Sequence, residues 1–554
     1  MSKTLFAIIV CTLTMGFAKS LPAQTDLYLA LSSPQRVVDD VKAILDLTTP
    51  EEQEQKEVLN DYFDLLLDGI DQSLILKLDV ISEPQEARYR IFFPVTQKTR
   101  DFRENLKGYD FISRRDRKNP SLYTVAGEYT GFLLFDIPYA ILVKQQVDLE
   151  TIRVGAMNAF STHEKLNDLP EVDVILSLKN EGGDVEERHA KFGGIEELIK
   201  AYVTRREGES AEDFAVREGM ANILIDELER VYAEGKSMLT TWSLPAPVEN
   251  GQFTTLIDPI AETSLAATVN QLKEHPSQFA GIPEREDAIL KLRILLPLDE
   301  LRQKNLSEYS KVMQAAIVKT ITDDAEKSED SKQAFNSASD LFFAMLDESI
   351  KSGWLDTVAQ VYNNDAGRVS LGVMNAVNGE EARKILELVP KTAEGRAIEF
   401  DIDKQGDVSI HKLTFEEGAL QSLQGFFGDD VVVYVGTSTN AFWISAGANA
   451  VEELKSAITQ AEAEPAKPTE THRFVDLKLA VGAWVETVHK ARGESGNDKL
   501  YNFAKSAFEE GADAITLQLN QKGDVIDGEL NIEQGVLRLA GKLIADFSAE
   551  NLEE

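Results

Sequence analysis

One local pattern occurs four times along this chain: an amphipathic helix, a glycine, and two alternating strands joined by a tight turn. The last copy is the clearest, because a helical stripe containing Leu500 and Phe503 ends at Gly511. Two runs with a period of two follow, at residues 514–519 and 525–532. A change of apolar period from 3.6 to 2 marks the passage from helix to strand. This stretch therefore predicts a helix followed by an antiparallel hairpin.

A glycine stands at the end of each predicted helix and sets the direction of the hairpin that follows. These structural helix stops are Gly69, Gly235, Gly353 and Gly511. Glycine ends a helix readily because it adopts a positive φ without a clash from a Cβ atom. The turns within the hairpins contain Gly, Asn, Asp or Pro, the residue types that tight turns require.

The spacing of these glycines indicates a duplication. Gly69 and Gly353 lie 284 residues apart, and Gly235 and Gly511 lie 276 residues apart. Two similar halves, each with two helix–hairpin units, account for both spacings; the alternative is that the local pattern is common and the spacing is coincidental. We predict an α+β fold in which repeated helix–Gly–β-hairpin units form curved antiparallel sheets, with amphipathic helices packed on one face.

Composition shifts and turn residues divide the chain into segments. The predicted segments are a signal peptide (1–23), a first half of two α+β units (24–275), a boundary (276–287), the first unit of the second half with extra hairpins (288–460), a linker (461–471), a last unit (472–547) and a tail (548–554). The linker is acidic and contains two prolines, which is typical of an extended connection.

The N-terminal segment has the pattern of a secretory signal peptide. Lys3 precedes an apolar run, Leu5–Ala18, that is too short to span a membrane as a helix. Small residues supply two cleavage sites, so we expect the mature chain to begin between Leu21 and Gln24. A lipoprotein anchored at Cys11 is the alternative, but the residues before this cysteine lack the small side chains of a lipobox. We expect an exported protein, periplasmic or extracellular, with no transmembrane helix in the mature chain.

The charge balance argues against two classes of partner. The formal net charge is −37, and removal of Lys3 and Lys19 with the signal peptide makes it −39. Nucleic acids and anionic membrane surfaces both need basic patches, which this chain lacks overall. One basic cluster stands out as a weak anion-site candidate: Arg114, Arg115, Arg117 and Lys118. The alternative is a solvated loop paired with nearby carboxylates.

No recognisable catalytic or metal-binding motif is present. Cys11 is the only cysteine, and none of the six histidines has the His-Glu-x-x-His spacing. Gly235-Lys-Ser237 lacks the earlier glycine of a phosphate-binding loop, and residues 401–412 lack the final glutamate of a calcium loop. We therefore assign no catalytic, cofactor-binding or metal-binding residues and expect no cofactor. The four tryptophans are interpreted as core residues, with a ligand-stacking surface as the alternative.

Residues 430–436 with 441–446 and 451–458, and residues 527–539, are similar to a pattern in large uncharacterised exported proteins of environmental bacteria. The similarity covers mainly residues 397–544. It implies export and an α+β fold, and it carries over no functional residues.

The function expected from the sequence is that of an exported soluble, non-enzymatic binding protein. A sheet covered by helices rich in Phe, Leu and Met can hold an apolar ligand between the two layers. A structural or protein-interaction component of the cell envelope is the alternative, and a hydrolase without a recognisable motif is a third possibility. The partner is expected to be an apolar small molecule or an envelope protein.

Overall fold

The computed structural model describes residues 25–551, except 84–85, 109–110, 128–129, 151–171, 181–183, 207, 246–247, 326, 393–395, 416–425, 428–430, 464–470 and 493–498. The predicted signal peptide lies outside the described residues, as do most of the predicted linker and His163.

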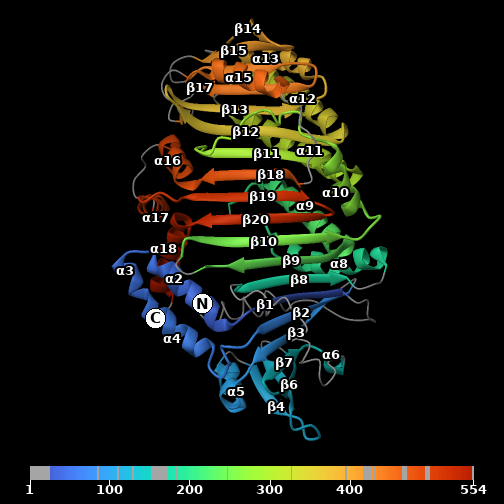
Figure 1. The fold of residues 1–554 in the computed structure, drawn as a ribbon, viewed down its shortest axis with the longest axis vertical. Helices are drawn as coiled ribbons and strands as arrows, with labels where there is room; N and C mark the ends of the chain where they lie inside the picture. The colour runs from blue at the N-terminus through green and yellow to red at the C-terminus, as the bar shows by residue number, and fades with distance from the viewer. Residues whose placement is uncertain are drawn as a thin grey trace.

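A single open antiparallel sheet forms the body of the molecule (Figure 1). Its strands are β1 Thr25–Leu31, β2 Leu76–Glu83, β3 Glu86–Pro94, β4 Phe111–Arg115, β5 Leu122–Gly127, β6 Gly131–Asp136, β7 Tyr139–Val143, β8 Val174–Asn180, β9 Gly235–Ser243, β10 Asn250–Pro259, β11 Leu290–Pro297, β12 Trp354–Asn364, β13 Gly367–Asn375, β14 Arg396–Gln405, β15 Val408–Phe415, β16 Val433–Thr437, β17 Ala441–Gly447, β18 Thr471–Ala480, β19 Ala514–Lys522 and β20 Val525–Glu533. The prediction of an α+β fold built on antiparallel strands is confirmed, but as one continuous sheet.

The described helices lie between these strands in the sequence, except the last, which follows β20. They are α2 Pro34–Asp46, α3 Pro50–Gln53, α4 Gln55–Leu66, α5 Thr99–Gly108, α6 Val147–Glu150, α8 Val185–Lys200, α9 Ala211–Glu234, α10 Ser264–Glu274, α11 Glu300–Asp323, α12 Glu329–Lys351, α13 Ala382–Thr392, α15 Ala450–Ala463, α16 Val481–Arg492, α17 Lys499–Ala507 and α18 Gln534–Asn551. Side-chain caps begin several of them: Thr49 and Glu52 form a capping box at α3, and Ser210, Asp299 and Ser328 cap α9, α11 and α12.

The order of strands in space differs from their order in the chain. Across the sheet it is β4-β5-β6-β7-β3-β2-β1-β8-β9-β10-β20-β19-β18-β11-β12-β13-β17-β16-β15-β14, with every neighbouring pair antiparallel. The last three strands, β18–β20, therefore lie in the middle of the sheet (Figure 1).

The pairing scheme of β1–β10 recurs in β11–β20. When each strand of the first set is matched to the strand numbered ten higher, every pairing in the first set has its counterpart in the second. Helices also fall at matching places, with α11 and α12 between β11 and β12 as α2 and α4 lie between β1 and β2. The two sets meet where β10 pairs with β20.

Most helices pack on one face of the sheet, which we call the helix face. Helices α8 and α9 pack there against Leu178 and Met238, and α10 packs against Leu519 and Ile526. The expectation that all helices share one face is wrong for α15, because its residue Leu454 packs with Ile410 and Trp443 on the opposite face. At each end of the sheet, buried apolar residues lie on both faces, so both faces need a helix to cover them there.

The segment between the two sets of strands is part of the core. Residues 276–287, predicted as a boundary, contain Phe279 and Ile282, both buried against Val358 and Trp443. The Arg293 guanidinium donates to the carbonyl of Ile282 at 2.8 Å and holds the segment against the sheet. No helix in the described part of the chain is long and apolar enough to cross a membrane.

Three of the four predicted helix-stop glycines have a positive φ: Gly69 (79°), Gly353 (90°) and Gly511 (73°). Gly235 differs, because its φ is −71° and α9 passes directly into β9. A Cβ atom at this position would contact the carbonyl oxygen of Val231. Glycine is needed at position 235 for close approach of the backbone, not for a left-handed turn.

Candidate functional site

An apolar pocket of about 330 Å³ lies on the helix face, between α11, α12 and the ends of β12 and β13. Its wall is formed by Leu298, Leu306, Tyr309, Ser310, Met313, Ile317, Phe342, Phe343, Leu346, Ser349, Ile350, Trp354, Leu355, Met374 and Asn375. This volume is at the lower end of the roughly 300–1,000 Å³ of small-molecule sites. The pocket is thus large enough to hold part or all of a small apolar molecule.

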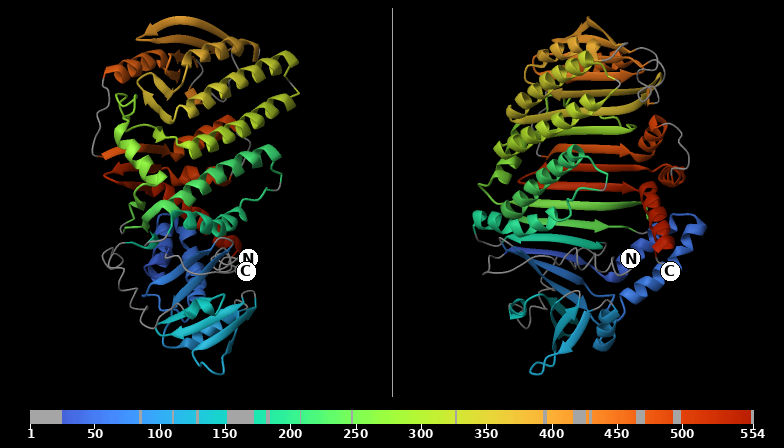
Figure 2. Two further views of the ribbon diagram at one scale, coloured as in Figure 1. Left: turned by 90° about the vertical axis from the view of Figure 1, so that its right-hand side faces the viewer. Right: turned by 180° about the vertical axis from the view of Figure 1, so that it is seen from behind.

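The pocket follows from the apolar spacing of two long helices. Leu306, Met313 and Ile317 fall on one side of α11, and Ser310 beside them is buried. Ile317 and Phe342 remain 37% and 36% exposed. The C-terminal end of α11 and the N-terminal end of α12 lie away from the sheet (Figure 2).

The serine hydroxyls in the wall are already bonded within the protein. The hydroxyl of Ser310 donates to the carbonyl of Ser307, and that of Ser349 donates to the carbonyl of Met345. Trp354 closes one end of the pocket, with its ring 4.5 Å from that of His275. Because these hydroxyls have partners, the wall presents chiefly hydrocarbon and aromatic surface.

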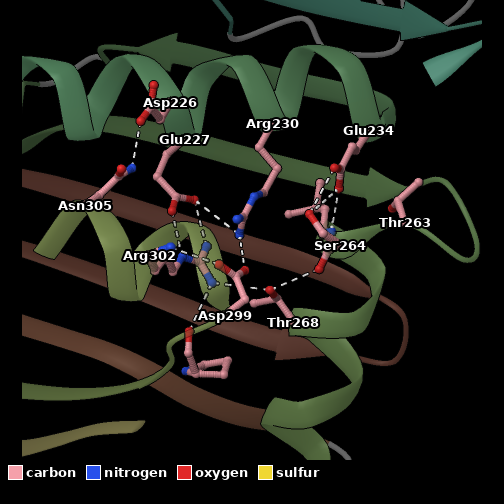
Figure 3. Close-up of polar contacts among 12 residues, drawn as sticks. Asp226, Glu227, Arg230, Glu234, Thr263, Ser264, Thr268, Asp299, Arg302 and Asn305 are labelled. Atoms are coloured by element: carbon pink, nitrogen blue, oxygen red, sulfur yellow. Dashed lines mark hydrogen bonds and ion pairs between the residues drawn. The ribbon is translucent and has the colours of Figure 1, made fainter. Parts of the chain in front are cut away.

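A charged network fixes α9 against α10 and α11 beside this pocket (Figure 3). Arg230, only 2% exposed, pairs with Asp299 at 2.7 Å, and Arg302 donates to both oxygens of Glu227 at 2.6 and 2.7 Å. Burial acts to raise the pKa of Asp299, but the Arg230 ion pair and the amide of Arg302 together bring that pKa below its ordinary value. This network is structural, because each of its charges has a partner.

The C-terminal end of α9 is joined to α10 through Glu234. This carboxylate accepts from the Ser264 hydroxyl at 2.8 Å and from the Leu265 amide at 2.6 Å (Figure 3). A polar pocket of about 450 Å³ lies next to it, where His189 contacts Glu229 at 2.9 Å. Within the described ranges, no group of three or more His, Cys, Asp or Glu residues is arranged to hold a metal ion.

A third pocket, of about 490 Å³, lies between the N-terminal part of α9 and Tyr309 of α11. Val216, Met220, Ala221 and Leu224 form its floor. At its rim Arg217 pairs with Glu209 through contacts of 2.8 and 2.9 Å, and this pair lowers the pKa of Glu209 to about 2. Tyr309 lines both this pocket and the apolar pocket between α11 and α12, so the two are neighbours.

The centre of the sheet presents an apolar surface on the same face. One row of directly paired residues crosses six strands: Trp242, Phe253, Leu530, Leu517, Leu477 and Leu292. None of the six is buried, and Phe253 is 38% exposed. The adjoining row on the opposite face is polar: Thr241, Thr254, Glu529, Gln518, Asp476 and Arg293. The central strands are therefore amphipathic, with their apolar side toward the helices.

The residues singled out in the sequence are not brought together. Arg114 and Arg115 lie on the edge strand β4, and Arg117 and Lys118 lie in the turn after it, all exposed and remote from the pockets. The calcium-like stretch forms the β14–β15 hairpin, as its alternation indicates. His411 is a fully buried core residue whose Nε2 lies 3.0 Å from the Thr437 hydroxyl; burial lowers its pKa.

Sequence reasoning did not identify the pocket residues. Leu306, Met313, Leu346 and Ile350 look the same in sequence as residues of a closed core. The one signal available was the length of α11 and α12. Each is about 35 Å long, so the end of the neighbouring sheet cannot cover the whole apolar side of either helix.

Comparison with known proteins gives no relative. No protein-family model matches the chain, and neither a curated protein nor a solved structure matches it.

Proposed function

We propose that this chain is an exported binding protein that holds an apolar ligand between its helices and its sheet. The observation that carries the proposal is the apolar pocket between α11, α12 and the ends of β12 and β13. Its serine hydroxyls bond internally, so a ligand there meets chiefly hydrocarbon and aromatic surface. Burying an apolar molecule there stabilises the complex by roughly 25 cal/mol for each Å² removed from water.

Support for binding over catalysis comes from the chemistry of the wall. Charged groups beside the pocket, such as Arg302 and Asp299, are engaged in ion pairs that fix helices. A carrier needs a shaped apolar space, and the described residues of this wall supply one that contains no carboxylate, histidine or lysine.

We infer further that the two sets of strands arose by duplication. The recurring pairing scheme supports this, as do the matching helix positions and the glycine spacing. The apolar pocket is on α11 and α12 of the second set, so the proposed binding function belongs to one copy of the repeated architecture.

Lipid extraction from the purified native protein, followed by mass spectrometry, tests the proposed function. We expect a stoichiometric apolar molecule, and we expect its loss in Met313→Glu, because a carboxylate in the pocket wall strongly disfavours hydrocarbon beside it. Leu301→Glu is the matched control: it lies on α11, is 38% exposed and is outside the pocket wall. Absence of bound apolar material in the wild type, together with no thermal stabilisation by added lipid, contradicts the proposal.

A further inference from the structure

The apolar side of α9 faces the same space as the pocket. Residues on an α-helix are about 100° apart. On α11, viewed from its N-terminus, the pocket residues Leu306, Met313 and Ile317 lie roughly 70° clockwise from the residues that contact α9, such as Asn305 and Tyr309. The residues that contact α12, such as Ser307, lie roughly 160° clockwise from those that contact α9. The pocket therefore opens on the sheet side of the helix layer, as Trp354 and Met374 in its wall require.

Helix α9 runs antiparallel to α11, because Asp226 contacts Asn305 while Gly219, two turns earlier on α9, packs on Tyr309, one turn later on α11. Because α9 and α11 point in opposite directions, a clockwise turn away from their mutual contact leads to the sheet side on both helices, when each is viewed from its own N-terminus. A stripe of three residues, Met220, Leu224 and Leu228, lies roughly 120° clockwise from the residues of α9 that contact α11. This stripe, which we call the α9 stripe, thus points to the sheet side.

The α9 stripe is strongly exposed although it points inward. Met220, Leu224 and Leu228 are 44%, 58% and 50% exposed. The helix diverges from the sheet toward its N-terminus (Figure 2). Opposite this side of the layer, the central strands present the row from Trp242 to Leu292, none of it buried. Two incompletely covered apolar surfaces of one chain therefore face one another.

We propose that the ligand is a long-chain lipid whose aliphatic chain runs from the apolar pocket past Tyr309 and along the α9 stripe. This deepens the proposed function and rests on it. The stripe adds about 12 Å of helix to the pocket, and one leaflet of a bilayer's hydrocarbon core is about 15 Å thick. A thin flexible chain can occupy both the apolar pocket and the third pocket beside the α9 stripe, because the two pockets meet at Tyr309.

Charge at the rim selects the head group. Glu209 and Asp213 border the third pocket, where Arg217 is already paired with Glu209. The whole chain carries a formal net charge of −37. An anionic head is repelled by these carboxylates, so the lipid has a neutral or zwitterionic head.

A chain-length series tests the proposal. The probes are lysophosphatidylcholines with 6, 10 and 16 carbons, measured by titration of tryptophan fluorescence below their micelle concentrations. Affinity is expected to rise up to about fourfold for each added methylene, and to keep rising between 10 and 16 carbons. Leu224→Glu and Leu228→Glu should weaken binding of the 16-carbon probe at least about tenfold and leave the 6-carbon probe unchanged.

The control variant is Asn222→Glu, which adds the same charge to an exposed position on the opposite side of α9 and should bind all probes as the wild type does. Circular dichroism of each variant checks that α9 is intact. Equal affinity for the 10- and 16-carbon probes, with wild-type binding by both stripe variants, overturns this inference and leaves the pocket as the binding site. Failure of every probe, with no lipid extracted, overturns the proposed function as well. A 16-carbon fatty acid binding more tightly than the 16-carbon lysolipid overturns the head-group assignment.

Discussion

At the scale of single residues, glycines with the same backbone conformation differ in what surrounds them. Gly69 and Gly511 have φ values of 79° and 73°. A Cβ atom at Gly69 would collide with the backbone of Phe102 at the N-terminal part of α5, whereas nothing lies within 4 Å of one at Gly511. Glycine is therefore needed at position 69 for two reasons, its left-handed backbone conformation and the close approach of α5.

Replacement of these two glycines by alanine should separate strain from collision. Gly511→Ala is expected to lower stability by about 1–2 kcal/mol, the cost of a left-handed conformation for an ordinary residue. Gly69→Ala should lower it further, because α5 must move or the turn must change. Chemical denaturation followed by circular dichroism measures both. Equal losses in the two variants contradict the role given to Phe102.

A second residue-scale feature is the carboxyl pair of Asp40 and Asp173. Burial first, and then the charge of Asp173, raise the pKa of Asp40 to about 7, against the opposing effect of Arg36. The folded-state pKa lies above the unfolded value of 3.8, so protonated Asp40 favours the folded state. This contribution to the free energy of unfolding is complete below about pH 4 and is lost as pH rises through 7.

Asp40→Asn should therefore melt at a higher temperature than the wild type at pH 8, where Asp40 is ionised, and this advantage should shrink progressively as the pH falls toward 4. Thermal unfolding across this pH range measures the difference. Asp64→Asn, at an exposed position on α4, is the comparison for removal of a surface carboxylate. Parallel pH profiles for Asp40→Asn and the wild type would show that the pair does not titrate as described.

At the scale of elements, the segment between the two sets of strands shows what periodicity misses. Residues 276–287 have the turn-rich composition of a linker, yet Phe279 is 3% exposed and its ring lies 5.6 Å from that of Trp443. The other residues of its buried cluster come from β12, β13, β15, β17 and α15, elements far along the chain. Local composition does not report such contacts.

Phe279→Ala is expected to destabilise the protein by about 3–5 kcal/mol, the usual loss for removing a buried aromatic ring. Phe253→Ala, at a position 38% exposed in the centre of the sheet, should have a much smaller effect. Urea unfolding of both variants makes the comparison. A small effect at Phe279 would mean that the segment can leave the core without disturbing it.

The elements that sequence predicts well are those determined by their own residues. Residues 514–519 and 525–532 lie within β19 and β20, and the predicted helix before Gly511 corresponds to α17. Gly235 does follow the last residue of α9, but its expected left-handed conformation is wrong, because its need for glycine comes from Val231, one turn earlier in a helix that continues directly into a strand. The pocket was missed because it depends on how far α11 and α12 diverge from the sheet, which no local pattern records.

At the scale of the whole molecule, the glycine spacing indicated a repeat, but nothing in the sequence predicted that the last strands, β18–β20, lie in the middle of the sheet. Pairing between β10 and β20 joins residues 269 to 283 positions apart, such as Phe253 and Leu530. Which strands become neighbours depends on which edges remain free once other strands have paired, so strand order is a property of the assembled sheet.

The central place of β18–β20 has a consequence for how the chain reaches its native state. As the polypeptide emerges, β10 and β11 each have an edge whose native partner comes much later in the chain: β20 pairs with β10 across at least 269 positions, and β18 pairs with β11 across at least 181. Both edges remain open templates for foreign strands until the last unit arrives, and contacts of such long sequence separation form slowly. Aggregation is therefore most favoured between the synthesis of β10 and its pairing with β20. A chaperone bound to these edges during that interval would prevent them from pairing with other chains.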